Sequence, residues 1–102
     1  MDINTLLQYH RKRIQEGKLR GCNWTTDRWC IKLMEELGEF AECLNKPDDP
    51  TLSKEEELAD LVHTTLCIAI SMGVNDIETL LRSKFNEVSL RKGSSIMISE
   101  QS

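Results

Sequence analysis

Two acidic stretches, each set in an apolar helical pattern, constrain this 102-residue chain more than any other feature. Glu36 and Glu39 lie three residues apart in the first stretch, and Glu57 and Asp60 repeat that spacing in the second. On an α-helix this spacing places both side chains on one face, nearly one above the other. The helical periodicity puts each pair at the edge of an apolar stripe. The sequence therefore predicts two amphipathic helices, each with a carboxylate pair beside its buried face.

If these helices pack antiparallel through their apolar stripes, the carboxylates meet at one seam. Such a cluster does not stay ionised beside a core without a counter-charge. A hard divalent cation, Mg²⁺ or alternatively Mn²⁺, is the simplest one because it prefers oxygen ligands. We predict metal-assisted phosphoanhydride hydrolysis with four residues as metal ligands and catalytic groups: Glu36, Glu39, Glu57 and Asp60. The neighbouring Glu35 should point to the opposite, wet side of its helix.

The remaining periodicity predicts an all-α, four-helix bundle with helices at residues 4–16, 25–45, 54–72 and 76–91. Residues 46–50 contain two prolines and break the pattern. Capping-box spacings at Ser53 and at Asn75 open the last two helices. We expect a single domain over residues 1–92 and a flexible Ser-rich tail over 93–102.

Composition narrows the class of protein. No apolar run approaches the ~20 residues that span a bilayer, so we expect a soluble chain that does not engage a membrane. Four cysteines without Cys-x-x-Cys spacing fit a reducing cytoplasm. The net charge of −4, with an acidic centre, argues against binding to a nucleic-acid polymer. A chain this short would gain by forming homo-oligomers.

The last helix carries two basic residues of interest. Lys84 projects from the middle of its expected inner face, and Arg91 lies two turns later on the same side. Lys84 either snorkels along the apolar stripe or reaches the carboxylate cluster or a bound phosphate. Lys84 and Arg91 are candidate substrate contacts that would neutralise charge on the leaving phosphates. The expected inner face consists of apolar residues: Ile77, Leu80, Leu81, Phe85 and Val88.

A carboxylate-bridged di-iron site is an alternative to the Mg²⁺ site, but the spacing of the residues disfavours it. Such bundles use Glu-x-x-His pairs, and the only comparable spacing here joins Asp60 to His63. The helical wheel places His63 outside the inner face. His10 fits a surface or packing role better than that of a ligand.

The arrangement of Glu35-Glu36-x-x-Glu39 followed by Glu57-x-x-Asp60 resembles the EExxE…ExxD signature of the MazG-like all-α nucleoside triphosphate pyrophosphatases. The resemblance covers about residues 24–92. It implies hydrolysis between the α and β phosphates of a nucleotide, with Mg²⁺ held by the same four carboxylates. It also implies that Lys84 contacts phosphate and that a homodimer or homotetramer shares the site between subunits.

Substrate contacts and alternatives stay open at this stage. Trp24, Trp29, Lys32 and the loop at residues 18–23 are candidates for a base pocket, although core packing suits Trp29 better. One alternative function is a non-catalytic nucleotide-binding or interaction module. Another is a related hydrolase that acts on dUTP or phosphoribosyl-ATP.

Overall fold

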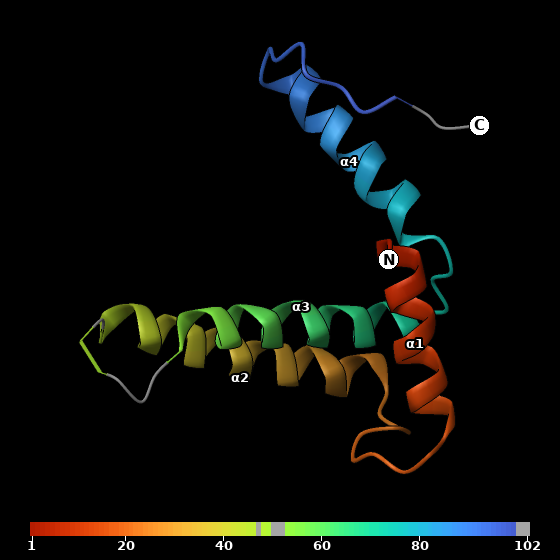
Figure 1. Ribbon diagram of the computed structural model, residues 1–102, viewed down its shortest axis with the longest axis vertical. Coiled ribbons are helices and arrows are strands. Elements are labelled where there is room, and N and C mark those ends of the chain that lie inside the picture. The colour runs from red at the N-terminus through yellow and green to blue at the C-terminus, as the bar shows by residue number, and fades with distance from the viewer. Residues whose placement is uncertain (47, 50–52, 100–102) are drawn as a thin grey trace.

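Four α-helices make up the computed structural model, which describes residues 1–46, 48–49 and 53–99 (Figure 1). No strand occurs within these ranges, so the all-α prediction is confirmed. Each helix begins and ends within one residue of its predicted bounds. The helices are α1 (Ile3–Gln15), α2 (Thr26–Asn45), α3 (Lys54–Ser71) and α4 (Ile77–Arg91). Residues 47 and 50 of the predicted breaker lie outside the described residues.

The N-terminal caps follow the sequence at α3 but not at α4. The Ser53 hydroxyl accepts the Glu56 backbone N–H at 3.2 Å, as predicted. At α4 the cap is Asp76 and not the predicted Asn75: the Asp76 carboxylate accepts the Thr79 backbone N–H at 3.0 Å. The Asn4 side chain of α1 also donates to Asp76, at 3.0 Å. This long-range bond favours Asp76, and a local sequence pattern does not reveal it.

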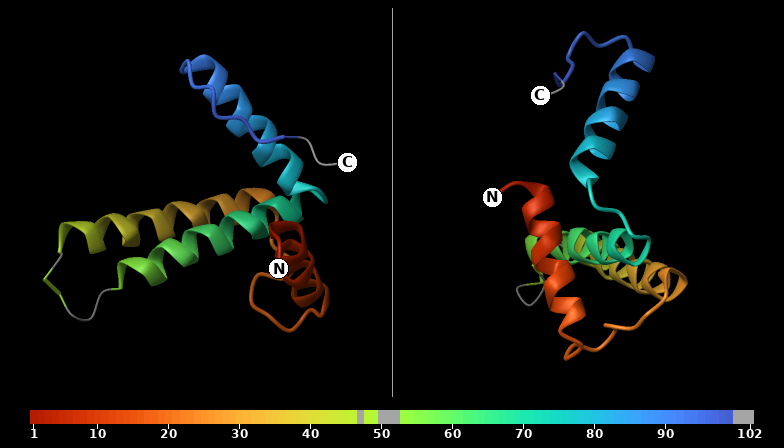
Figure 2. Two further views of the ribbon diagram at one scale, coloured as in Figure 1. Left: turned by 45° about the horizontal axis from the view of Figure 1, so that its top comes forward. Right: turned by 90° about the vertical axis from the view of Figure 1, so that its right-hand side faces the viewer.

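The helices form an antiparallel pair with two outlying helices rather than one closed bundle. α2 and α3 lie side by side, α1 crosses the end of α3, and α4 extends from α1 away from the α2–α3 pair (Figures 1 and 2). The predicted antiparallel packing of the two acidic helices is therefore confirmed, whereas α4 does not close onto them within one chain. A small core joins α1, α3 and the start of α4, formed by Leu7, Leu66, Ala69 and Ile77.

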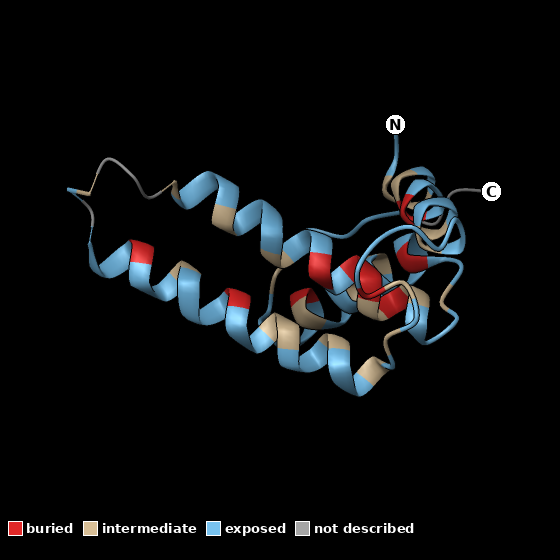
Figure 3. Ribbon diagram, turned by 90° about the horizontal axis from the view of Figure 1, so that it is seen from below, coloured by how far each residue is buried: buried red, intermediate tan, exposed pale blue. Residues whose placement is uncertain are grey.

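The buried face of α2 differs from the predicted apolar stripe. Glu36 and Cys43 are the buried residues of this helix, whereas Leu37 and Leu44 are more than half exposed (Figure 3). α2 is rotated so that the carboxylate edge, and not the centre of the stripe, faces α3. The predicted inner face of α4 is likewise open to solvent at Leu80, Leu81 and Phe85. A single chain has too few helices to cover these apolar faces.

The chain after α4 turns back along that helix. Gly93 adopts a φ of +74°, and the Ser94 backbone N–H donates to the Ser89 carbonyl at 2.8 Å. The Asn86 side chain then pairs with the backbone of Ile98, which donates to it at 2.7 Å and accepts from it at 2.9 Å. The described part of the predicted tail is thus hydrogen-bonded to α4, and its flexibility stays a prediction.

The α4 cap gives a testable pH dependence. Hydrogen bonds from Thr79 and Asn4 lower the pKa of Asp76 from 3.8 to about 2. Because the carboxyl is the stronger acid in the folded chain, its contribution to stability is complete above pH 3.8 and is lost as the pH falls towards 2. Urea unfolding of the wild type and of Asp76→Asn should therefore differ most above pH 4 and converge below it. A difference that does not change with pH would contradict this cause.

Candidate metal and nucleotide site

Three of the four predicted carboxylates meet at the seam between α2 and α3. One oxygen from each of Glu36, Glu39 and Glu57 lies within 4.8 Å of the other two. Glu36 is only 7% exposed, Glu57 is half-buried and Glu39 is open to solvent. The spacing of three residues places Glu36 and Glu39 on successive turns of α2, and the antiparallel α3 brings Glu57 opposite them.

The negative charge of this acidic seam is only partly compensated within the chain. One carboxylate oxygen of Glu36 and one of Glu57 are buried without a hydrogen-bond partner. Burial, with the nearby charges of Glu39 and Asp60, raises the pKa of Glu57. Two buried oxygens without partners, with the exposed carboxylate of Glu39 beside them, suit a hard divalent cation. The donor set therefore fits Mg²⁺ or Mn²⁺.

Asp60, the fourth predicted ligand, lies beside this group and not within it. Its carboxylate is exposed one turn along α3 from Glu57, whose pKa it helps to raise. It lines the same pocket as Glu36. Glu35 is exposed, as expected, but the prediction that it points to the opposite side is wrong, because Glu35 borders the same pocket as Glu36.

Lys32 is the nearest positive charge to the seam. Its ammonium lies 3.1 Å from a Glu36 oxygen and 3.8 Å from a Glu35 oxygen. The hydrogen bond to Glu36 raises the pKa of Lys32. Lys32 therefore remains protonated and offsets part of the negative charge at this end of the seam.

A pocket of about 420 Å³ opens beside the seam and joins the acidic groups to aromatic and basic ones. The Trp24 and Trp29 rings lie 4.7 Å apart, centre to centre. The Arg28 guanidinium lies 4.8 Å from the centre of the Trp24 ring. Residues from the loop before α2, from α2 and from α3 line this pocket: Arg20, Trp24, Arg28, Trp29, Lys32, Glu35, Glu36, Asp60, His63 and Thr64.

A glycine packs closely against the Trp24 ring that lines this pocket. Gly21 has a φ of +89°, and a Cβ atom at this position would lie 3.0 Å from the Trp24 ring. Sequence reasoning included Trp24 and Lys32 but missed Arg28. One feature of the sequence could have indicated Arg28: it lies four residues after Trp24 and just beyond a helix cap.

The two predicted α4 contacts lie elsewhere. The Lys84 ammonium pairs with Glu87 at 2.9 Å, and the Arg91 guanidinium lies 3.9 Å from the same carboxylate. Both side chains are exposed on a helix that extends away from the α2–α3 pair (Figure 1). Within one chain, the structure does not bring Lys84 or Arg91 to the acidic seam.

Comparison with known proteins yields one match. Residues 25–89 match the sequence model of the MazG nucleotide pyrophosphohydrolase domain, which is more than half of the chain. The matched range contains the acidic seam and excludes α1. No curated protein and no solved structure matches the chain. Among the described helices, none has the length and apolar character needed to cross a membrane.

Proposed function

This chain belongs to the MazG nucleotide pyrophosphohydrolase family, and we propose that it hydrolyses a (deoxy)nucleoside triphosphate to the monophosphate and pyrophosphate with Mg²⁺ as cofactor. The single observation that carries this proposal is the acidic seam, in which two buried carboxylate oxygens lack partners. The substrate would be a small molecule and not a nucleic-acid polymer. Removal of non-standard or excess nucleotides is the role we assign to it.

The proposed ligands of the ion are Glu36, Glu39 and Glu57, with Asp60 next to them. When bound, the ion would neutralise phosphate charge and act as a Lewis acid; Mn²⁺ would serve the same role. Asp60 is exposed in the pocket and is not among the three clustered carboxylates. It is therefore the group best placed to orient the attacking water and accept its proton.

Different residues of the pocket would bind different parts of the substrate. Lys32, Arg20 and Arg28 add positive charge to a wall that continues from the carboxylates. Phosphate oxygens would accept hydrogen bonds from these side chains. The exposed part of the Trp24 ring offers a surface on which a base could stack.

We further propose that the complete site needs a second copy of the chain. The apolar face of α4 is exposed at Leu80, Leu81 and Phe85, which is typical of a surface covered by a partner. Association of copies into a homodimer or homotetramer would bury this face. It would also bring Lys84 and Arg91 of one subunit towards the phosphates bound by another.

A nucleotide panel tests the proposed reaction. The purified protein is incubated with Mg²⁺ and each of the standard nucleoside triphosphates, dUTP and phosphoribosyl-ATP, and the products are identified by ion-exchange chromatography. We expect a nucleoside monophosphate and pyrophosphate. Release of orthophosphate with a diphosphate would overturn the assigned bond. Tight binding without any product would favour the non-catalytic module.

A further inference from the structure

A second group of potential ligands lies between α1 and α3, apart from the three clustered carboxylates. It consists of His10, His63 and Cys67, and one ligand atom from each lies within 4.8 Å of the other two. His63 and Cys67 lie four residues apart on one face of α3, and His10 reaches them from α1. His10 and Cys67 are buried, whereas His63 is exposed. The two imidazole rings lie 4.7 Å apart, centre to centre.

The chemistry of this group differs from that of the acidic seam. Imidazole nitrogen and thiolate sulfur favour Zn²⁺ and related transition metals over Mg²⁺. Around a tetrahedral Zn²⁺, bond lengths of about 2.0–2.3 Å place the donor atoms within roughly 4 Å of each other. Small side-chain rotations would close the difference from the observed arrangement. Solvent could reach a fourth coordination position past the exposed His63.

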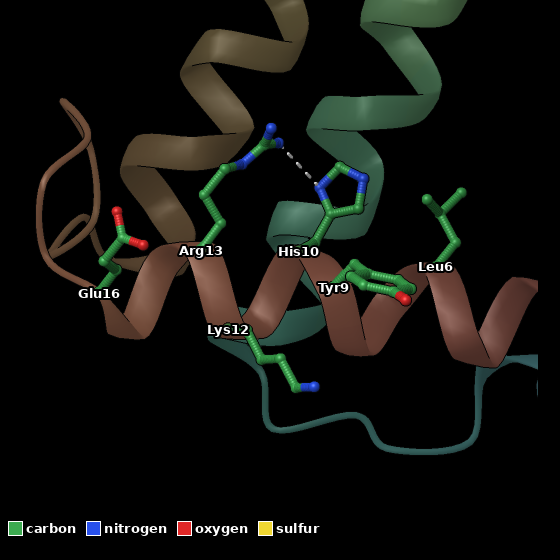
Figure 4. Close-up of a pocket in the computed structure, with 6 residues that line it drawn as sticks. All are labelled: Leu6, Tyr9, His10, Lys12, Arg13 and Glu16. Carbon is green, nitrogen blue, oxygen red and sulfur yellow. Dashed lines mark hydrogen bonds between the residues drawn. The ribbon is translucent and has the colours of Figure 1, made fainter.

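One ring nitrogen of His10 is oriented away from the competing cation. A guanidinium nitrogen of Arg13 lies 3.5 Å from His10 Nδ1, and the other ring nitrogen lies on the opposite side of the ring (Figure 4). Arg13 is exposed and borders a pocket of about 420 Å³. It therefore has room to turn away from a bound ion.

We propose that His10, His63 and Cys67 bind one Zn²⁺ ion between α1 and α3. On binding, the Cys67 thiol loses its proton to solvent and its sulfur forms a bond to the ion. Since α1 lies outside the matched family range, the ion would tie this additional helix to the catalytic helices. His63 also borders the proposed nucleotide pocket, but the Zn²⁺ ion would be separate from the proposed Mg²⁺.

Cobalt provides a probe that reports on the thiolate directly. Titration of the metal-free protein with Co²⁺ in excess Mg²⁺ should give a near-ultraviolet sulfur-to-cobalt charge-transfer band that saturates at one equivalent, and Zn²⁺ should abolish it. Carboxylates cannot produce this band. Cys67→Ala should eliminate it, and His63→Gln should weaken Co²⁺ binding by at least about 100-fold. Arg13→Gln should strengthen binding several-fold, because it removes a neighbouring positive charge.

The matched control is Cys43→Ala, which alters another buried cysteine at the α2–α3 seam and should leave the band intact. His63 is exposed, so His63→Gln keeps the test valid if Cys67→Ala fails to fold. Absence of the band in the wild type would overturn the proposal. So would a band that survives His63→Gln at full affinity or that disappears in Cys43→Ala. The readout is spectroscopic, so loss of hydrolysis would not affect it.

Discussion

Glu39→Gln is expected to reduce nucleotide hydrolysis by about 100- to 1,000-fold while preserving the fold. Glu39 is the most exposed of the three clustered carboxylates, and its charge raises the pKa of the half-buried Glu57. The amide retains the shape of the side chain but removes one charged ligand. Because like charges repel at the seam, the variant without metal should be at least as stable as the wild type. Initial rates with Mg²⁺, and thermal melts with and without it, would measure both effects.

Glu42→Gln is the matched control for this experiment. It makes the same substitution on the same helix, but the Glu42 carboxylate is exposed and pairs with Lys46 at 2.6 Å. We expect near-normal hydrolysis and a normal Mg²⁺-dependent rise in melting temperature. Full activity in Glu39→Gln would remove the acidic seam from the mechanism. A loss of activity as large in Glu42→Gln would mean that net charge, and not ligation, matters.

Phe85→Asp is expected to separate the proposed oligomer into single chains. Phe85 is 43% exposed on the apolar face of α4, where a partner subunit would have to bury the introduced carboxylate. A cost of about 3 kcal/mol corresponds to roughly a 100-fold weaker association. Light scattering coupled to size-exclusion chromatography would measure the mass. Hydrolysis should fall in parallel, because Lys84 and Arg91 would no longer reach another subunit's pocket.

Ser83→Asp provides the control on the same helix. Ser83 is exposed and lies on a side of α4 away from the apolar face, so its substitution should leave the mass unchanged. A wild-type protein that is a single chain at micromolar concentration would contradict the assembly. Unchanged mass in Phe85→Asp would show that another surface makes the contact.

The parts of the fold that depend on local spacing could be read from the sequence. A spacing of three residues, repeated at Glu36 and Glu57, placed carboxylates on one face of each acidic helix, and the antiparallel packing of those helices brought three of the four together. The pattern also located the helices, because glycine, proline and capping residues act within a few positions.

Features that depend on contacts between distant segments could not be read in this way. The prediction from helical periodicity assumed that the most apolar side of α2 faces inward, but Leu37 is exposed and Glu36 is buried. In a chain that is too small to cover all of its apolar surface, hydropathy does not say which face a neighbour within the same chain covers. The pairing of His10 with His63 likewise depends on how α1 crosses α3.

The contribution of α1 to the core has a practical consequence for anyone who shortens this chain. Leu7 is completely buried against α3, and the Asn4 side chain accepts the backbone N–H groups of Ile77 and Glu78 at the start of α4. A fragment trimmed to the family match at residue 25 would lack both residues. It would expose Leu66 to water and leave two N–H groups in the first turn of α4 without their acceptor. Expression trials and transplanted versions of α2 and α3 should therefore begin upstream of α1.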